Sequence, residues 1–159
     1  MENSSRIKAL CFTGHRDIEP EKVDYVRQEL RREIKSAIAD GFEYFISGFA
    51  EGVDQWAAEI VLELKAEHPN IRLEAAIPYR NRIRQLQKNE KTANLLRGCG
   101  SILVWSEDYA PNCFMIRNRA MLKQATRLVA VYDKRYKGGT AQTIRFARAQ
   151  GKEIHIILV

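Results

Sequence analysis

The chain has 159 residues, of which 45% are hydrophobic and 29% are charged, the balance of an ordinary globular protein. Its net charge of +6 indicates either a solvated basic surface or attraction to an anionic ligand, and we favour the first interpretation for most of the charge. No apolar run approaches the roughly 20 residues of a membrane span, so the composition excludes a membrane-spanning protein and predicts no membrane partner.

The cysteines argue against a metal site or a disulfide framework. Cys11, Cys99 and Cys113 are few and irregularly spaced, which is typical of a cytoplasmic protein in a reducing compartment. No two cysteines or histidines stand at the spacing of metal ligands, so we expect no metal, and no pattern in the chain requires a cofactor. A chain of this length buries about 70% of its unfolded surface, and we expect residues 1–159 to form one domain.

Short apolar runs alternate with helical patterns along the chain. Met1–Ser5 is expected to be a loose terminus, and six strands with intervening helices follow. The expected strands are Ile7–Phe12, Phe42–Ile46, Ile71–Ile77, Ser101–Trp105, Leu128–Tyr132 and Glu153–Leu158. The expected helices are Glu19–Asp40, Trp56–Leu64, Arg80–Arg97, Cys113–Ala125 and Ala141–Ala149. This order predicts an α/β fold, a Rossmann-like three-layer αβα sandwich with a mainly parallel sheet of about six strands.

Glycines and polar residues follow three of the expected strands. Gly14–Arg16 comes after the first strand, Ser47–Asp54 after the second, and Gly138–Thr140 after the fifth. Open parallel sheets bind ligands beyond the carboxyl ends of their strands, where the strand order reverses. We therefore expect a ligand-binding site there, with candidates Gly14, His15, Arg16, Ser47, Gly48, Glu51, Asp54, Gly138, Gly139 and Thr140.

The segment after the fifth strand has the pattern of a phosphate-binding loop. Gly138 and Gly139 allow a ligand to approach the backbone closely, and Thr140 is a suitable cap for the helix that follows. Two adjacent glycines alone usually form a flexible turn, but the free amides of a helix N-terminus bind anions. Such a terminus contributes roughly 0.3–2 kcal/mol, whereas even millimolar affinity requires about 4 kcal/mol. A positively charged side chain must therefore supply part of the binding energy for the anion.

Arg16, Arg117 and Arg119 are the candidates for that side chain, because a charge-assisted hydrogen bond contributes roughly 1.5–3 kcal/mol. Arg117 and Arg119 are two residues apart and cannot share one helix face, so at most one of them points into the site. The alternative for both is a solvated helix end. Asn118 is able to hydrogen-bond a ribose or the neighbouring loop.

His15, Glu51 and Asp54 are each open to two interpretations. His15 titrates near neutral pH and can act as a general base, but without an evident nucleophile a hydrogen-bonding or stacking role is favoured. Asp54 near a helix start stabilises the helix dipole. Either acid can instead bond ribose hydroxyls or stabilise an oxocarbenium-like centre, and Glu51 is the weak candidate for a catalytic residue.

Four stretches together resemble the SLOG superfamily, the Rossmann-like group that joins the DNA-processing protein A fold to the LOG (lysine-decarboxylase-like) phosphoribohydrolases. Thr13–Arg16 is similar to the opening loop of the YpsA-type branch, and Ser47–Asp54 to the small-residue loop of DNA-processing proteins. Arg117–Arg119 resembles the segment ahead of their fifth strand, and Gly138–Thr140 resembles the LOG phosphate loop. The match is best with the YpsA-type branch of small bacterial proteins, and it implies that Arg117 is the arginine in the site.

The resemblance implies binding of a nucleotide or a nucleotide-derived ligand such as a relative of ADP-ribose. LOG proteins carry a glutamate just past the Gly-Thr pair that takes part in cleaving the N-glycosidic bond, but Ala141–Arg145 contains no acid. Hydrolysis of nucleoside monophosphates, with Glu51 as the replacement carboxylate, is therefore the alternative. Whether the protein is an enzyme is left open.

Two further expectations concern partners. Binding of single-stranded nucleic acid is a third hypothesis, by likeness to DNA-processing proteins and because of a basic segment in which Tyr79 is the lone aromatic neighbour. A homo-oligomer is expected because self-association is common in the superfamily. The basic segment consists of Arg80, Arg82, Arg84, Lys88, Lys91 and Arg97.

Overall fold

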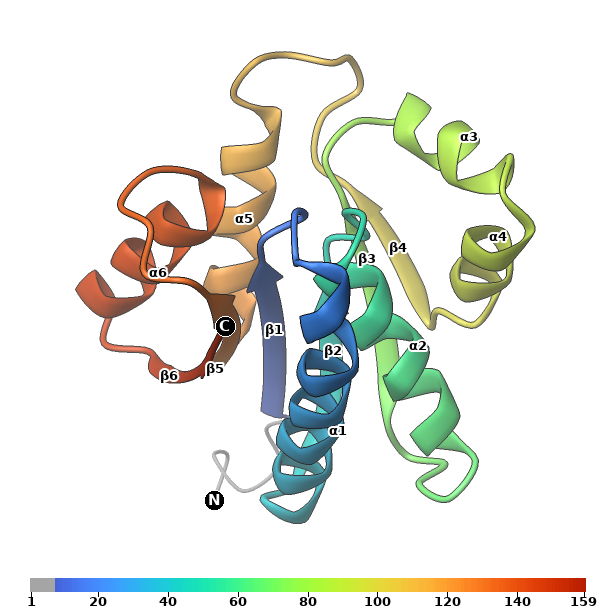
Figure 1. The fold of residues 1–159 in the computed structure, drawn as a ribbon. Coiled ribbons are helices and arrows are strands. Elements are labelled where there is room, and N and C mark those ends of the chain that lie inside the picture. The colour runs from blue at the N-terminus through green and yellow to red at the C-terminus, as the bar shows by residue number, and fades with distance from the viewer. Residues whose placement is uncertain (1–7) are drawn as a thin grey trace, which may run out of the picture.

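The computed structural model describes residues 8–159, so the expected loose terminus and Ile7 of the first strand lie outside the described residues. Strands and helices alternate along the described chain (Figure 1). The strands are β1 (Lys8–Gly14), β2 (Phe42–Ser47), β3 (Arg72–Ile77), β4 (Ser101–Val104), β5 (Arg127–Tyr132) and β6 (Glu153–Leu158). The helices are the 3-10 turn η2 (Pro20–Lys22), α1 (Val23–Ala39), α2 (Val53–Lys65), α3 (Asn81–Gln87), α4 (Glu90–Arg97), α5 (Cys113–Gln124) and α6 (Gly139–Ala149). None of the helices in this part of the chain is long and apolar enough to cross a membrane.

The six strands form one sheet in the order β4-β3-β2-β1-β5-β6, and every neighbouring pair is parallel. The prediction of a mainly parallel sheet is confirmed. The chain winds outward from β1 to β4 and then returns through α5 to the other side of β1. The strand order therefore reverses between β1 and β5, which is where open parallel sheets bind their ligands.

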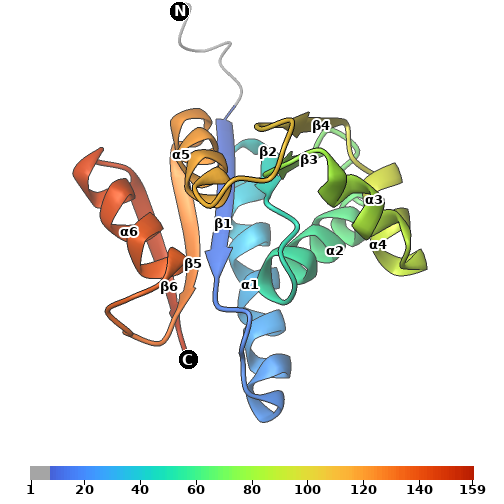
Figure 2. The same cartoon turned by 90° about the horizontal axis from the view of Figure 1, so that it is seen from above.

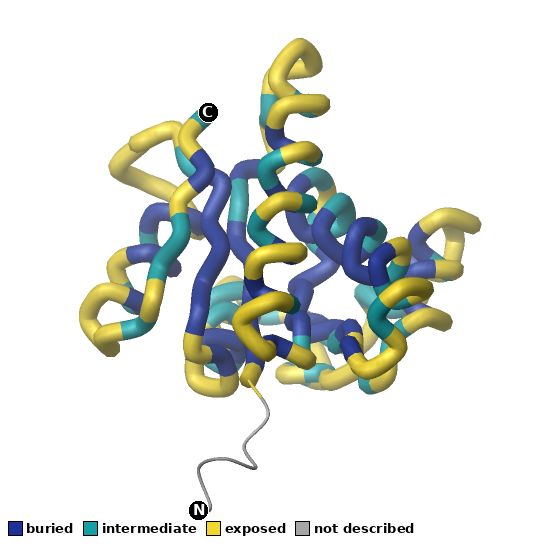
Figure 3. The backbone as a smooth tube through the Cα atoms, turned by 90° about the horizontal axis from the view of Figure 1, so that it is seen from below, coloured by how far each residue is buried: buried dark blue, intermediate teal, exposed yellow. Residues whose placement is uncertain are grey.

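Helices cover both faces of the sheet. Helices α1, α2, α3 and α4 pack on one face, and α5 and α6 pack on the other (Figure 2). Side chains of β1 alternate between the layers, with Leu10 and Phe12 facing the first group of helices and Ala9 and Cys11 facing the second. Figure 3 shows the central strands buried, while the helices alternate between buried and exposed positions. Because both faces of the central strands are covered, these strands are continuous apolar runs in the sequence.

The expected helix Arg80–Arg97 is two helices, and the prediction of a single one was wrong. Helix α3 ends at Gln87 and α4 begins at Glu90. Asn89 between them has an extended backbone, and its side-chain oxygen accepts hydrogen bonds from the amides of Lys91 at 2.9 Å and Thr92 at 3.3 Å. This cap starts a second helix inside a stretch that has no glycine or proline to mark a boundary.

Strand β1 continues two residues beyond the predicted end at Phe12. Its last residues, Thr13 and Gly14, pair with Ala130 and Val131 of β5. A Cβ at Gly14 would lie 2.6 Å from the side chain of Val53, the first residue of α2. The missing side chain thus lets the start of α2 pack directly against the end of β1, at the edge of the sheet that carries the site.

Candidate functional site

A pocket of about 440 Å³ opens at the carboxyl edge of the sheet, where the loops after β1 and β5 face each other. Its volume is within the range of small-molecule sites. The fold brings together residues from all three glycine loops and from α5. The predicted site residues that line the pocket are Gly14, His15, Arg16, Asp54, Arg117, Asn118, Gly138, Gly139 and Thr140.

The loop after β5 presents backbone amides to this pocket. Gly138 is the N-cap of α6 and has a φ of 107°, which favours glycine, and the helix begins at Gly139. Thr140 is not the cap that the sequence predicted, because it lies inside the first turn with its side chain buried. Within residues 8–159, the amides of Gly139, Thr140 and Ala141 donate no hydrogen bond to a protein acceptor. These amides are therefore available to an anion at the positive end of the helix dipole.

Arg16 contributes an exposed positive charge to the same pocket. It follows Gly14 and His15 in the loop after β1, and its guanidinium lies 5.9 Å from the ring centroid of Phe114. Among the described residues it forms no ion pair, although its charge helps to lower the pKa of the buried Asp54 in the same pocket.

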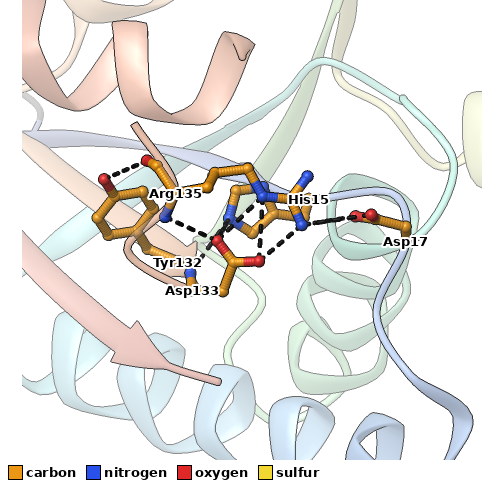
Figure 4. Close-up of polar contacts among 5 residues, drawn as sticks. All are labelled: His15, Asp17, Tyr132, Asp133 and Arg135. Atoms are coloured by element: carbon orange, nitrogen blue, oxygen red, sulfur yellow. Dashed lines mark hydrogen bonds and ion pairs between the residues drawn. The ribbon is translucent and has the colours of Figure 1, made fainter. Parts of the chain in front are cut away.

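Arg135, by contrast, is fully engaged (Figure 4). Its Nη2 lies 2.6 Å from a carboxylate oxygen of Asp133 and 3.1 Å from one of Asp17. These hydrogen bonds lower the pKa of Asp133 and raise the pKa of Arg135. Asp17 and Arg135 line the pocket but were not predicted, because their contact joins loops that are far apart in the sequence. These contacts link the loops after β1 and β5, and they leave Arg16 as the exposed arginine of the pocket without an ion pair among the described residues.

His15 joins the loops after β1 and β5. The amide of Asp133 donates to its Nε2 at 3.1 Å, and its ring centroid lies 5.8 Å from that of Tyr132. Burial lowers the pKa of His15 in spite of the Asp133 carboxylate, whose Oδ1 lies 3.1 Å from the same Nε2. Nε2 thus faces both the amide and the carboxylate of Asp133, and these contacts support the hydrogen-bonding and stacking interpretation over the general base.

Arg117 is buried beneath the pocket. Its Nη1 donates to the carbonyl of Gly48 at 2.6 Å and to the carbonyl of Ala76 at 3.2 Å, which fastens the ends of β2 and β3 to α5. Arg119 points elsewhere, with its guanidinium 4.2 Å from the ring centroid of Phe146 on α6. Arg117 therefore reaches the site and Arg119 does not, in agreement with the expectation that at most one of them points into it. The main contacts of Arg117 are with backbone carbonyls of the protein itself.

Asp54, in the first turn of α2, and Ser47, at the end of β2, form hydrogen bonds that hold the loop between these two elements. Asp54 is buried, and its Oδ2 accepts a hydrogen bond from the amide of Ala50 at 3.3 Å. Burial raises the pKa of Asp54 to about 6, against the opposing charge of Arg117. Ser47 is fully buried and donates to the Asp54 carbonyl at 2.8 Å. Ser47 and Gly48 thus lie under the pocket and support it, whereas the sequence suggested that they contact the ligand.

Glu51 lies in an adjoining cavity of about 200 Å³. Glu51 is exposed and does not line the larger pocket, so the expected catalytic candidate lies outside the pocket that contains the amides of α6. Phe114 lines both cavities and was not predicted. The sequence could have indicated it, because Phe114 stands three residues before Arg117 and both residues therefore lie on one face of α5.

These features define a Rossmann-like α/β protein with a pocket of free amides and arginines at its topological switch point. The family model described as YspA SLOG family (YpsA) matches residues 10–158, and the chain belongs to this family. The superfamily and branch predicted from the four motifs are confirmed.

The relatives agree with this assignment. UPF0398 proteins from Bacillus thuringiensis (strain Al Hakam) and Bacillus cereus (strain B4264) are each 24% identical to this chain over 163 residues, which covers 92% of it and 85% of theirs. DNA processing protein A from Helicobacter pylori, whose structure was described for its single-stranded DNA binding mode, superposes with a TM-score of 0.65 at 19% identity. That match covers 94% of this chain, which spans 64% of the Helicobacter protein. The protein TM1055 superposes with a TM-score of 0.58 at 17% identity, over 93% of this chain and 72% of its own. The two structures confirm the fold.

Proposed function

We propose that this protein binds a nucleotide or nucleotide-derived ligand, ADP-ribose-like in class, through a phosphate group at the carboxyl edge of its sheet. One observation carries the proposal. Gly139 and Thr140, whose amides have no acceptor within residues 8–159, and the exposed Arg16 line the same pocket of about 440 Å³. Amides at a helix N-terminus and an arginine without a carboxylate partner are the two groups that phosphate recognition in proteins uses most.

These two contacts alone bring the binding free energy close to that of weak, millimolar affinity. The helix terminus contributes roughly 0.3–2 kcal/mol and a charge-assisted hydrogen bond from Arg16 roughly 1.5–3 kcal/mol. Together they approach the roughly 4 kcal/mol of millimolar affinity. Tighter binding requires contacts with the ribose and the base, and Asn118 and Asp54 in the pocket wall offer polar groups for the ribose.

Replacing Arg16 by alanine should weaken binding of ADP-ribose by about 10- to 100-fold, because the ligand phosphate loses its charged donor. Titration calorimetry of the wild type and the Arg16→Ala variant against ADP-ribose, cyclic ADP-ribose, AMP and NAD measures this. Arg84→Ala is the matched control, since Arg84 is exposed on α3 and lines neither cavity. The proposal is contradicted if the wild type gives no binding heat with any of the four ligands, or if the Arg16→Ala variant binds ADP-ribose as tightly as the wild type does.

Hydrolysis of an N-glycosidic bond is a second candidate function, and one observation favours it. Asp54 lines the pocket, and its pKa of about 6 lies in the range of a general acid at neutral pH. If the protein is a hydrolase, incubation with AMP should release adenine detectable by chromatography, and Asp54→Asn should abolish the release while Arg84→Ala leaves it unchanged. Absence of released base with the wild type removes this candidate.

Binding of single-stranded DNA, for which the Helicobacter protein's structure was described, has less support in this chain. Several cations of its basic segment are engaged within the protein. Arg80 pairs with Glu107 at 2.7 Å, Lys91 pairs with Glu59 at 3.0 Å, and Arg82 donates to a backbone carbonyl at 3.1 Å. A phosphate backbone would have to displace these partners, which lowers the gain from counterion release.

A further inference from the structure

The cavity of about 200 Å³ beside the pocket has no glycine in its lining. Glycines and the amides of α6 lie in the wall of the larger pocket, together with charged and aromatic side chains, whereas only long aromatic, amide and charged residues line the smaller cavity. Arg16 and Phe114 line both, so the two cavities meet at these side chains. A ligand whose phosphate lies at Arg16 is therefore within reach of the smaller cavity. Its lining residues are Arg16, Glu51, Tyr79, Arg82, Gln85 and Phe114.

Three aromatic rings form an edge-to-face cluster at this junction. Tyr79 follows β3, Tyr109 lies in the loop before α5, and Phe114 is in the first turn of α5. The ring centroids of Tyr79 and Tyr109 are 5.4 Å apart, and each is 6.2 Å from the centroid of Phe114. Tyr109 is 61% exposed, far more than a core aromatic. Tyr79 and Phe114 of this cluster also line the smaller cavity, and aromatic side chains that line a cavity are the surfaces on which nucleic acid bases stack.

The polar side chains of the smaller cavity offer a donor and an acceptor. The side-chain oxygen of Gln85 accepts from the Tyr79 hydroxyl at 3.3 Å and from Arg82 Nη1 at 3.2 Å. The orientation of its amide is therefore set, and its NH₂ group remains as the donor. Glu51 is exposed, and its carboxylate supplies an acceptor in the same cavity. A base that matches this pair carries an exocyclic amine next to a ring nitrogen that accepts.

We propose that the smaller cavity receives the base of the ligand, stacked on Tyr79 or Phe114, and that it selects a base with an exocyclic amine beside a ring acceptor, as in adenine. This inference rests on the proposed function, because the phosphate must first be held at Arg16 and α6. It adds the chemical class of the group at the other end of the ligand and the residues that recognise it.

Titration calorimetry of the full chain with three probes tests the inference. AMP carries the amine, IMP has an oxygen in its place, and ribose 5-phosphate has no base. AMP should bind at least tenfold more tightly than ribose 5-phosphate and about tenfold more tightly than IMP. Equal affinities for AMP and ribose 5-phosphate overturn the base site while leaving the phosphate site intact. Failure of all three probes to bind overturns the proposed function and this inference with it.

Variants locate the effect. Phe114→Leu and Tyr79→Leu should each weaken AMP about tenfold and leave ribose 5-phosphate within twofold, and Glu51→Gln should remove the preference for AMP over IMP. Tyr79→Leu changes a second, only partly buried ring of the smaller cavity, so it keeps the test decisive if Phe114→Leu does not fold. Phe146→Leu on α6 is the matched control, because Phe146 lines neither cavity. Equal losses of AMP and ribose 5-phosphate affinity in both leucine variants contradict the proposal.

Discussion

Replacing Arg117 by methionine is expected to lower the free energy of unfolding by about 3–5 kcal/mol. Methionine keeps most of the apolar stem but leaves the buried carbonyls of Gly48 and Ala76 without their charged donor. Each unsatisfied buried acceptor costs about 1–3 kcal/mol, and the ionised Asp54 loses its opposing charge. Chemical denaturation of the wild type and the variant, followed by circular dichroism, measures the difference.

The loss in the Arg117→Met variant should also grow with pH. Burial raises the pKa of Asp54 from 3.8 in an unfolded chain to about 6 in the fold, so ionising this carboxyl destabilises the folded state, and the cost is complete only above pH 6. Without Arg117 the folded pKa rises further, so the cost continues to increase beyond pH 6. The variant should therefore fall further behind the wild type at pH 8 than at pH 5. Adding Asp54→Asn should remove this pH-dependent part.

Arg119→Ala is the matched control for this prediction. Arg119 lies two residues further along α5, is exposed, and stacks on Phe146, a contact that contributes about 0.5–1 kcal/mol at such a site. A loss below about 1 kcal/mol for Arg117→Met, or equal losses at pH 5 and pH 8, contradicts the role that we assign to Arg117.

Gly48→Ala should also lower the free energy of unfolding, by about 2–4 kcal/mol. This range lies between the cost of overpacking a core and the cost of removing the Arg117 contacts altogether. A Cβ at Gly48 would lie 2.7 Å from Arg117 Nη1 and 3.0 Å from Asp54 Oδ2, so the buried guanidinium must move off its carbonyl acceptors. Gly100→Ala is the control, because the nearest atom to a Cβ there is 3.8 Å away.

The Gly48 and Arg117 substitutions should not be additive. In the Arg117→Met background the guanidinium that Gly48→Ala displaces is already absent, so alanine at position 48 should cost at least about 1 kcal/mol less there than in the wild type. Unfolding free energies of the two single variants and the double variant complete the cycle. Additive losses indicate that the glycine serves the loop independently of Arg117.

Much of this fold follows from local patterns. The strand segments are short apolar runs, and the glycines that follow three of them occur where the chain turns at the sheet edge. Periodicity and glycine act over a few residues, so they can be recognised in a single sequence. The split between α3 and α4 was missed because one capping asparagine outweighed an unbroken helical pattern.

The sequence by itself determined the alternation of strands and helices, the parallel sheet and the glycine loops that surround the pocket. Only the tertiary structure decided which arginine keeps an open charge, because that depends on partners far away in the chain. Arg117 bonds to carbonyls 69 and 41 residues away, Arg135 pairs with Asp17 118 residues away, and Arg16 has no such partner among the described residues. Charge neutralisation is a long-range property of packing, whereas a strand or a turn is a property of neighbouring residues.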